Sequence, residues 1–174
     1  MTVPTATTLK ASDLRFERLL DAPVATVWRW IVDPELRARW FMGGPTDLRP
    51  SGTLGMTMDH DRLSDDPAPT PARYREFIGR SWSERILRVE PERLLAFEWD
   101  GGAEGVVTIS LSAEGDRTRL VLEHTGITSR TSAVDFAGGW GAHLHVLERR
   151  LRGEPVASFW DLHDLAERDA EATI

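Results

Sequence analysis

Residues 131–151 read TSAVDFAGGWGAHLHVLERRL and show the longest helical hydrophobic period in the chain. At 100° per residue their apolar side chains fall into one stripe, which predicts a helix with one buried face. Ser132 is suited to cap its start, and Gly153 followed by Pro155 is typical of a helix end. The stripe consists of Ala133, Phe136, Trp140, Leu144, Leu147 and Leu151.

Seven segments before this helix have the character of a sheet. Apolar and polar residues alternate along them, and most are joined by connections short enough for hairpins. Two short helices interrupt the series after the first strand, where Pro23 and then Asp33 with Pro34 are typical helix starts. The predicted strands are 14–20, 53–60, 74–78, 83–90, 94–100, 106–112 and 118–125.

This order of elements predicts an α+β fold with an antiparallel sheet of about six to seven strands. A curved sheet with one apolar face needs a cover, and the only element long enough is the helix at 131–151. We therefore expect the sheet to wrap around that helix. Gly138 and Gly139 are expected to allow the helix to pack closely on the sheet.

Composition excludes several classes of protein. The chain has 174 residues, which suits one domain, and a net charge of −7, which argues against binding nucleic acid through phosphates. The second of the two short helices offers only Arg37 and Arg39 to DNA. There is no cysteine, and no apolar run is long enough to span a membrane. Residues 1–12 lack the pattern of a signal peptide, so we expect a soluble cytoplasmic protein without membrane insertion.

Three segments lie outside the main pattern. Residues 1–12 are expected to be flexible, and the proline-rich stretch 61–72 is expected to be a mobile surface loop that borders a site. Residues 154–174 are expected to add a C-terminal helix capped by Ser158. Its aromatic pair, Phe159 and Trp160, must be buried, either on the same domain or in a homodimer contact.

Four stretches carry a family resemblance. They are LLDAPVATVWRWIVDPELRARWF at 19–41, RVEPERLLAFEW at 88–99, LVLEHTGI at 120–127 and GGWGAHLHVLERRL at 138–151. Their order resembles the START-like, polyketide-cyclase-like superfamily called SRPBCC. Within it, the chain is most similar to bacterial proteins that resemble the C-terminal domain of the activator of the heat-shock-protein-ninety ATPase. The resemblance covers about residues 13–153, which we take as the START-like domain.

The resemblance implies a helix-grip fold, in which a curved antiparallel sheet holds the C-terminal helix and a pocket lies between them. It does not imply an activity, because the superfamily includes lipid carriers, hormone receptors, cyclases and chaperone activators. Trp28 and Trp40 are expected at the mouth of the pocket. The expected ligand-binding residues are Phe16, Trp28, Trp40, Met56, Met58, Phe97, Trp99, Leu122, His124, Trp140, His143 and Leu144.

Histidines are the main candidates for chemistry in the pocket. His124 shares a strand face with two leucines, and His143 lies at the margin of the helix stripe, so both are candidates for proton transfer or ligand binding. His60 is a weaker candidate, and each histidine is alternatively a hydrogen-bonded structural group. Further polar residues on inner faces are Arg18, Asp59, Tyr74 and Glu76.

Other kinds of site lack support in the sequence. His143 and His145 point to opposite sides of the helix and no HExxH motif is present, so we expect no metal site. No serine nucleophile motif and no phosphate-binding loop occur, and no cofactor is expected.

Three functions stay open. The first is binding of an apolar or aromatic small molecule in the pocket. The second is an enzyme of cyclase or dehydratase type that uses His124 or His143 in the same cavity. The third is a co-chaperone that binds a chaperone partner on its outer surface.

Overall fold

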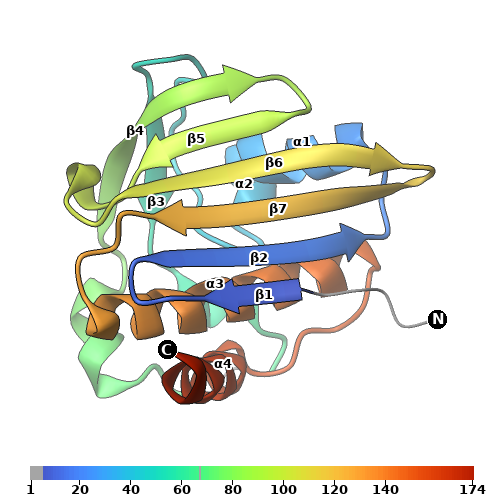
Figure 1. The fold of residues 1–174 in the computed structure, drawn as a ribbon. Helices are drawn as coiled ribbons and strands as arrows, with labels where there is room; N and C mark the ends of the chain where they lie inside the picture. The colour runs from blue at the N-terminus through green and yellow to red at the C-terminus, as the bar shows by residue number, and fades with distance from the viewer. Residues whose placement is uncertain (1–5, 67) are drawn as a thin grey trace.

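A computed structural model describes residues 6–66 and 68–174 (Figure 1). The strands and helices follow the predicted order except at β1 and at residues 74–78, and three short 3₁₀ helices lie between them. The strands are β1 (Ala6–Leu9), β2 (Asp13–Leu20), β3 (Thr53–Thr57), β4 (Ser81–Glu90), β5 (Leu94–Glu98), β6 (Val106–Glu114) and β7 (Arg117–Thr125). The helices are α1 (Val24–Val32), α2 (Pro34–Arg37), α3 (Arg130–Leu151) and α4 (Phe159–Thr173), and the 3₁₀ helices are η1 (His60–Leu63), η2 (Ala72–Phe77) and η3 (Asp100–Gly102).

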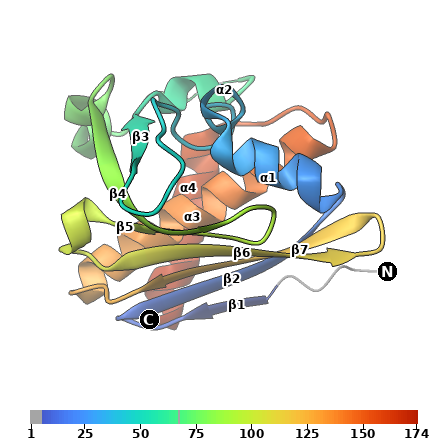
Figure 2. The same cartoon turned by 90° about the horizontal axis from the view of Figure 1, so that it is seen from above.

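The strands form one seven-stranded antiparallel sheet in the order β1-β2-β7-β6-β5-β4-β3. A tight turn joins β6 to β7 and places Gly115 at a φ of 61°, a conformation that glycine adopts without strain. The segment with α1 and α2 carries the chain from β2 to β3 at the far edge, and both helices lie on the same face of the sheet as α3 (Figure 2).

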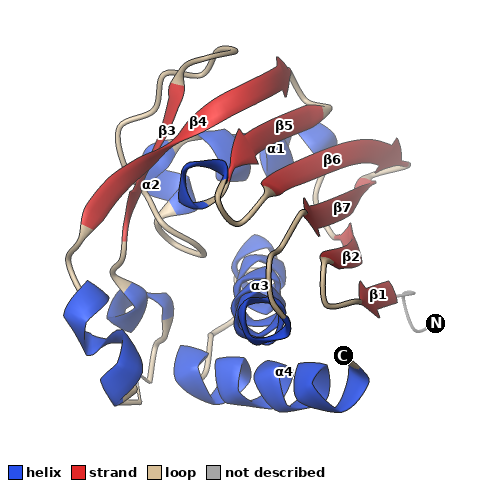
Figure 3. Cartoon of the chain, turned by 60° about the vertical axis from the view of Figure 1, so that its left-hand side comes forward, coloured by secondary structure: helices blue, strands red, loops and turns tan. Residues whose placement is uncertain are grey.

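The sheet curves around α3, and α4 lies on the side of α3 away from the sheet (Figure 3). This arrangement confirms the predicted helix-grip fold. Gly138 and Gly141 of α3 lie against α4, which differs from the predicted contact with the sheet. A Cβ on Gly138 would lie 3.0 Å from Glu167 Cβ, and one on Gly141 would lie 2.9 Å from Ala166 Cβ. The small residues therefore allow α4, rather than the sheet, to approach α3.

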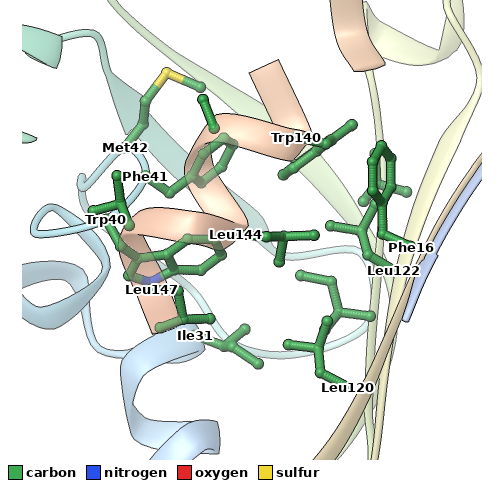
Figure 4. Close-up of a cluster of buried hydrophobic side chains, with 14 of the residues drawn as sticks. Phe16, Ile31, Trp40, Phe41, Met42, Leu120, Leu122, Trp140, Leu144 and Leu147 are labelled. Atoms are coloured by element: carbon green, nitrogen blue, oxygen red, sulfur yellow. The ribbon is translucent and has the colours of Figure 1, made fainter. Parts of the chain in front are cut away.

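The main core lies between the C-terminal half of α3 and the sheet. Figure 4 shows Leu144 and Leu147 of α3 with side chains of the α1–α2 region on one side and side chains of β2 and β7 on the other. Both leucines have no exposed surface. Fully burying such a side chain contributes about 1.5–3 kcal/mol, so packing holds the helix in place. The surrounding residues are Ile31, Trp40, Phe41, Phe16, Leu120 and Leu122.

Arg37 joins the α1–α2 segment to the sheet instead of facing a polyanion. It is 2% exposed, and burial lowers the pKa of its guanidinium to about 10, an effect partly offset by Asp33. In place of a paired carboxylate, backbone carbonyl oxygens accept the hydrogen bonds that the Arg37 guanidinium donates. They belong to Ile31, Val32, Met42, Gly44 and Gly55, with Thr46 Oγ1 as a further acceptor, at 2.8 to 3.3 Å.

The N-terminal segment departs from the prediction. Residues 6–9 of the stretch predicted to be flexible form β1, which pairs with β2. The outer edge of β2 offers unpaired backbone groups, and a strand can pair with them without an apolar pattern of its own. Residues 1–5 of the same prediction lie outside the described residues.

The predicted strand at 74–78 is wrong. Residues 72–77 form η2, in which Tyr74 N donates to Pro71 O at 2.9 Å. A segment of five residues was too weak a signal beside the fixed φ of the preceding proline, Pro71. The predicted strand 53–60 ends at Thr57, so His60 belongs to η1.

The stretch 61–72, expected to be a mobile loop, is tied to the α3–α4 connection; its residue 67 lies outside the described residues. Val156 N donates to Asp65 Oδ2 at 2.6 Å, and Phe159 N donates to Ser64 Oγ at 2.6 Å. Leu63 has no exposed surface. The stretch therefore fixes the start of α4 through hydrogen bonds and a buried anchor.

Helix ends follow the sequence in part. Ser158 Oγ accepts from Asp161 N at 3.2 Å, which is the predicted cap of α4. The cap of α3 is Ser129 instead of Ser132: Ser129 Oγ accepts from Ser132 N at 3.0 Å. None of the helices in the described chain is both long enough and apolar enough to cross a membrane.

Candidate functional site

A cavity of about 880 Å³ lies beside the N-terminal half of α3. Gly139 and Trp140 of α3 form part of its wall, and the start of α4 adds Trp160. The sheet contributes Trp99, which follows β5, and η2 contributes Tyr74. The cavity therefore lies where the sheet, α3, α4 and η2 meet.

Aromatic rings form most of the apolar wall. On the sheet side, the ring centroids of Trp99 and Trp140 are 5.4 Å apart, and Phe41 stacks on Trp140 at 5.1 Å. On the α4 side, Tyr74 stacks on Trp160 at 4.9 Å. Such ring pairs are worth about 0.5–1.5 kcal/mol each beyond their buried area, so these contacts stabilise the wall.

Gly139 is the point where α3 leaves space. An added Cβ would meet no described atom within 4 Å, although neighbouring Gly138 is crowded by α4. Glycine in a helix costs about 1 kcal/mol relative to alanine, so this position does not serve helix stability. Its effect is to keep the cavity open next to Trp140.

His143 lines the cavity and is 4% exposed. Its Nδ1 lies 2.7 Å from the backbone oxygen of Trp40, and since a carbonyl only accepts, Nδ1 carries the proton. Burial, with a smaller contribution from His60, lowers the pKa of His143 well below its ordinary value. The ring is neutral near pH 7, and Nε2 is a hydrogen-bond acceptor.

His60 and His163 lie close to His143. The rings of His60 and His143 are edge to face with centroids 4.8 Å apart, and burial together with the nearby His163 lowers the pKa of His60 to about 4. Burial also lowers the pKa of His163. Within the described chain, His60 Nδ1 and Trp160 Nε1 are enclosed and have no hydrogen-bond partner. This end of the cavity thus holds three neutral imidazoles.

Tyr74 and Asp135 form the polar pair of the cavity. The Tyr74 hydroxyl donates to Asp135 Oδ1, and His163 Nε2 lies 3.4 Å from the same hydroxyl. Burial and the Asp135 carboxylate raise the pKa of Tyr74, which keeps the phenol protonated. All three residues line the cavity.

His124 has a structural role. Its Nδ1 accepts from Trp140 Nε1 at 3.2 Å, and its Nε2 lies 2.8 Å from Glu104 O, to which it donates. Both ring nitrogens are therefore engaged, the side chain has no exposed surface, and it does not line the cavity. The prediction that His124 reaches the pocket is wrong; it orients the indole of Trp140 instead.

Two carboxylates of the wall are fixed by donors from the protein. Glu84 is 4% exposed and accepts from Trp82 Nε1 and from the backbone N–H groups of Asp100 and Gly101, at 3.0 to 3.1 Å. Glu104 accepts from the Thr128 N–H and hydroxyl and from Ser132. These bonds connect the η3 loop to β4 and the start of α3.

The structure divides the predicted site residues into two groups. Met58, Trp99, Trp140 and His143 line the cavity. The others are buried in the core and do not line it, because the predicted pocket was placed along the whole length of the helix. These are Phe16, Trp28, Trp40, Met56, Phe97, Leu122, His124 and Leu144. Trp28 and Trp40, expected at the mouth, are 8% and 1% exposed.

Several cavity residues were missed by the sequence interpretation. Tyr74 was a weak candidate on a predicted strand, and Trp160 was expected only to be buried somewhere. Phe77 and Trp82 are 37% and 38% exposed at the cavity. The signal available in the sequence was the group of aromatic residues that follows the proline-rich stretch. Among residues 6–66 and 68–174, no group of three or more His, Asp or Glu side chains is arranged to hold a metal ion.

A comparison with protein families identifies the family of the chain. The family described as Activator of Hsp90 ATPase homolog 1-like protein matches residues 21–152. The chain belongs to this family. Membership confirms the SRPBCC resemblance, and the match ends where α3 ends, so α4 and its share of the cavity wall lie beyond it.

Solved structures of similar proteins include members from several bacteria. A protein from Bordetella parapertussis, solved by NMR, is 38% identical with a TM-score of 0.81, over 100% of this chain and 96% of that one. CalU16 from Micromonospora echinospora is 24% identical with a TM-score of 0.68, over 99% and 98% of the two chains. DynU16, from the dynemicin biosynthetic locus, is 21% identical with a TM-score of 0.61, over 84% and 49%. A comparison with curated proteins found no match.

Proposed function

We propose that this member of the Activator of Hsp90 ATPase homolog 1-like family binds an apolar, aromatic small molecule in the cavity beside α3. The observation that carries the proposal is a volume of about 880 Å³ walled by aromatic rings from separate elements. Small-molecule sites typically measure about 300–1,000 Å³, with a mainly apolar lining and a few convergent polar groups. Here Tyr74, Asp135 and His143 provide such groups.

Tryptophan fluorescence offers a direct test, since Trp99, Trp140 and Trp160 line the cavity. Titration with a library of aromatic compounds should quench the emission with saturation. Native mass spectrometry and solvent extraction of the purified protein should reveal any molecule that is carried through purification. If no compound of a broad library binds, the proposal fails.

Gly139 supplies a matched pair of variants. Gly139→Leu places a four-carbon side chain in the open space and should weaken binding at least about tenfold, which corresponds to about 1.4 kcal/mol. Gly139→Ala adds only a methyl group and should bind like the wild type. Equal binding by wild type and Gly139→Leu would mean that the ligand sits elsewhere.

An enzyme that moves a proton in the same cavity is the second candidate. It is favoured by the neutral imidazole of His143, which lines the cavity and keeps Nε2 as an acceptor suited to a general base. His143→Gln should then lower turnover at least about tenfold once a substrate is known. An unchanged rate would remove this residue from the mechanism.

Binding to a chaperone partner, as the family description suggests, stays a prediction for this chain. It predicts a protein captured by affinity purification and no small molecule that competes with it. A homodimer through 154–174 also stays a prediction, but Phe159 and Trp160, which suggested it, are 1% and 7% exposed within a single chain.

A further inference from the structure

The polar lining of the cavity is negatively charged. Among the described lining residues, only Arg80 carries a guanidinium group. Its Nη2 lies 3.7 Å from Glu76 Oε2, and the group lies over the ring of Phe77. An anionic ligand would therefore meet like charges, which disfavours its binding. The lining carboxylates are Glu84, Asp100, Glu104 and Asp135.

Several donors along this wall are already used within the protein. Tyr74 donates to Asp135, and Trp82 Nε1 donates to Glu84 Oε1. Trp140 Nε1 donates to His124 Nδ1. A ligand thus meets acceptors at these positions, and a ligand that itself offers only acceptors finds few partners.

His143 Nε2 is the acceptor best placed to recognise a ligand through a hydrogen bond. In the part of the chain that the structure describes, Nε2 makes no hydrogen bond, yet it is not among the atoms that are both enclosed and unpaired. It therefore keeps some accessible surface, and the residue to which it belongs lines the cavity. The bond from Nδ1 to Trp40 O holds the ring in one orientation and one tautomer.

We propose that the cavity selects aromatic ligands that carry a hydroxyl or N–H donor over matched aromatic carboxylates, and that His143 Nε2 accepts the hydrogen bond from that donor. The inference rests on the proposed function and adds the chemical class of the ligand. It also assigns His143 a binding role that does not depend on catalysis.

A matched series of four probes tests the selection. Pyrene, 1-hydroxypyrene, 1-methoxypyrene and pyrene-1-carboxylate share one planar ring system and differ in one substituent. Titrations of the wild type at pH 7.5 should show 1-hydroxypyrene binding at least about tenfold more tightly than 1-methoxypyrene, since only the former donates. The carboxylate should bind more weakly than pyrene itself.

Two variants locate the acceptor. In His143→Asn, the side-chain amide can still donate to Trp40 O, but no atom occupies the place of Nε2. The ratio of hydroxypyrene to methoxypyrene affinity should fall to within about twofold in this variant. The exposed neighbour His145 on the same helix provides the control, and His145→Asn should keep the wild-type ratio.

A spectroscopic measurement covers the case in which His143→Asn does not fold. In the ¹⁵N-labelled wild type, the Nε2 resonance of His143 should shift upfield on saturation with 1-hydroxypyrene and not with 1-methoxypyrene. No shift would overturn the assignment to His143.

The outcomes separate the two proposals. If none of the probes binds, the proposed aromatic site itself fails. If all four bind with equal affinity, or the carboxylate binds most tightly, the cavity binds aromatic molecules but the selection for donors is overturned. If the selection survives in a folded His143→Asn, the role of His143 is overturned.

Discussion

Two parts of α3 differ in what they face. Toward its C-terminal end, Leu144 and Leu147 have no exposed surface and pack against the sheet and the α1–α2 segment. The preceding part of the helix, from Asp135 through Gly139 to His143, lines a cavity of about 880 Å³. One continuous helix thus serves as core at one end and as a wall at the other. Tight packing at the first end can keep the second end in place without filling it.

Truncation of a side chain in the packed part of α3 should cause the largest loss of stability. Leu147→Ala removes fully buried methyl groups and should lower the free energy of unfolding by about 2–5 kcal/mol, because the neighbouring side chains can only partly refill the space. Urea denaturation measures the change. A loss below about 1 kcal/mol would mean that this part is not the main core.

The buried histidines of the cavity should make the free energy of unfolding depend on pH. The folded pKa of His60, about 4, lies below its ordinary value of 6.5, so the unfolded chain binds the proton first as pH falls. The contribution of neutral His60 to the free energy of unfolding amounts to about 3 kcal/mol. It is fully present above about pH 6.5 and is lost as pH falls toward 4. Burial acts in the same direction on His143 and His163.

His60→Phe keeps an aromatic ring against Phe159 and Trp160 and removes the titrating group. Its free energy of unfolding should therefore vary less between pH 7 and pH 4 than that of the wild type, as measured by denaturation at several pH values. Identical slopes for the two proteins would show that His60 is not buried as a neutral ring.

Two glycines give the smallest and most local comparison. Gly139→Ala should stabilise the protein by about 0.5–1 kcal/mol, because the added methyl group meets no described atom within 4 Å and the helix gains propensity. Gly141→Ala should destabilise it, since its Cβ would lie 2.9 Å from Ala166 Cβ. Thermal unfolding of both variants checks the pair. Equal shifts would contradict the different surroundings of the two positions.

Much of the fold was predictable because periodicity reports burial. The stripe of 131–151 gave α3, and alternation gave β2, β4, β5, β6 and β7, since each has one face on a core. The edge strand β1 was not predicted, because backbone pairing at an edge requires no apolar pattern. The 3₁₀ helix η2 was not predicted either, since a segment as short as 74–78 resembles a short strand.

The site was less predictable than the fold. Periodicity places Trp140, His143 and Leu144 near one face, but it does not say which length of the helix meets the sheet and which meets a cavity. His124 and His143 had equal standing as pocket residues, and only their hydrogen bonds distinguish them: both nitrogens of His124 are engaged, whereas His143 keeps Nε2. The part of the cavity wall that α4 contributes could not be predicted, because it depends on where the chain turns after α3.

A crystal structure of the wild type with 1-hydroxypyrene would show whether aromatic ligands enter the cavity beside α3. Our account predicts density for the ring system between Trp99 and Trp160, beside Gly139, with the hydroxyl oxygen within hydrogen-bond distance of His143 Nε2. A cavity filled by its own side chains, with the compound bound on the outer surface, would contradict it.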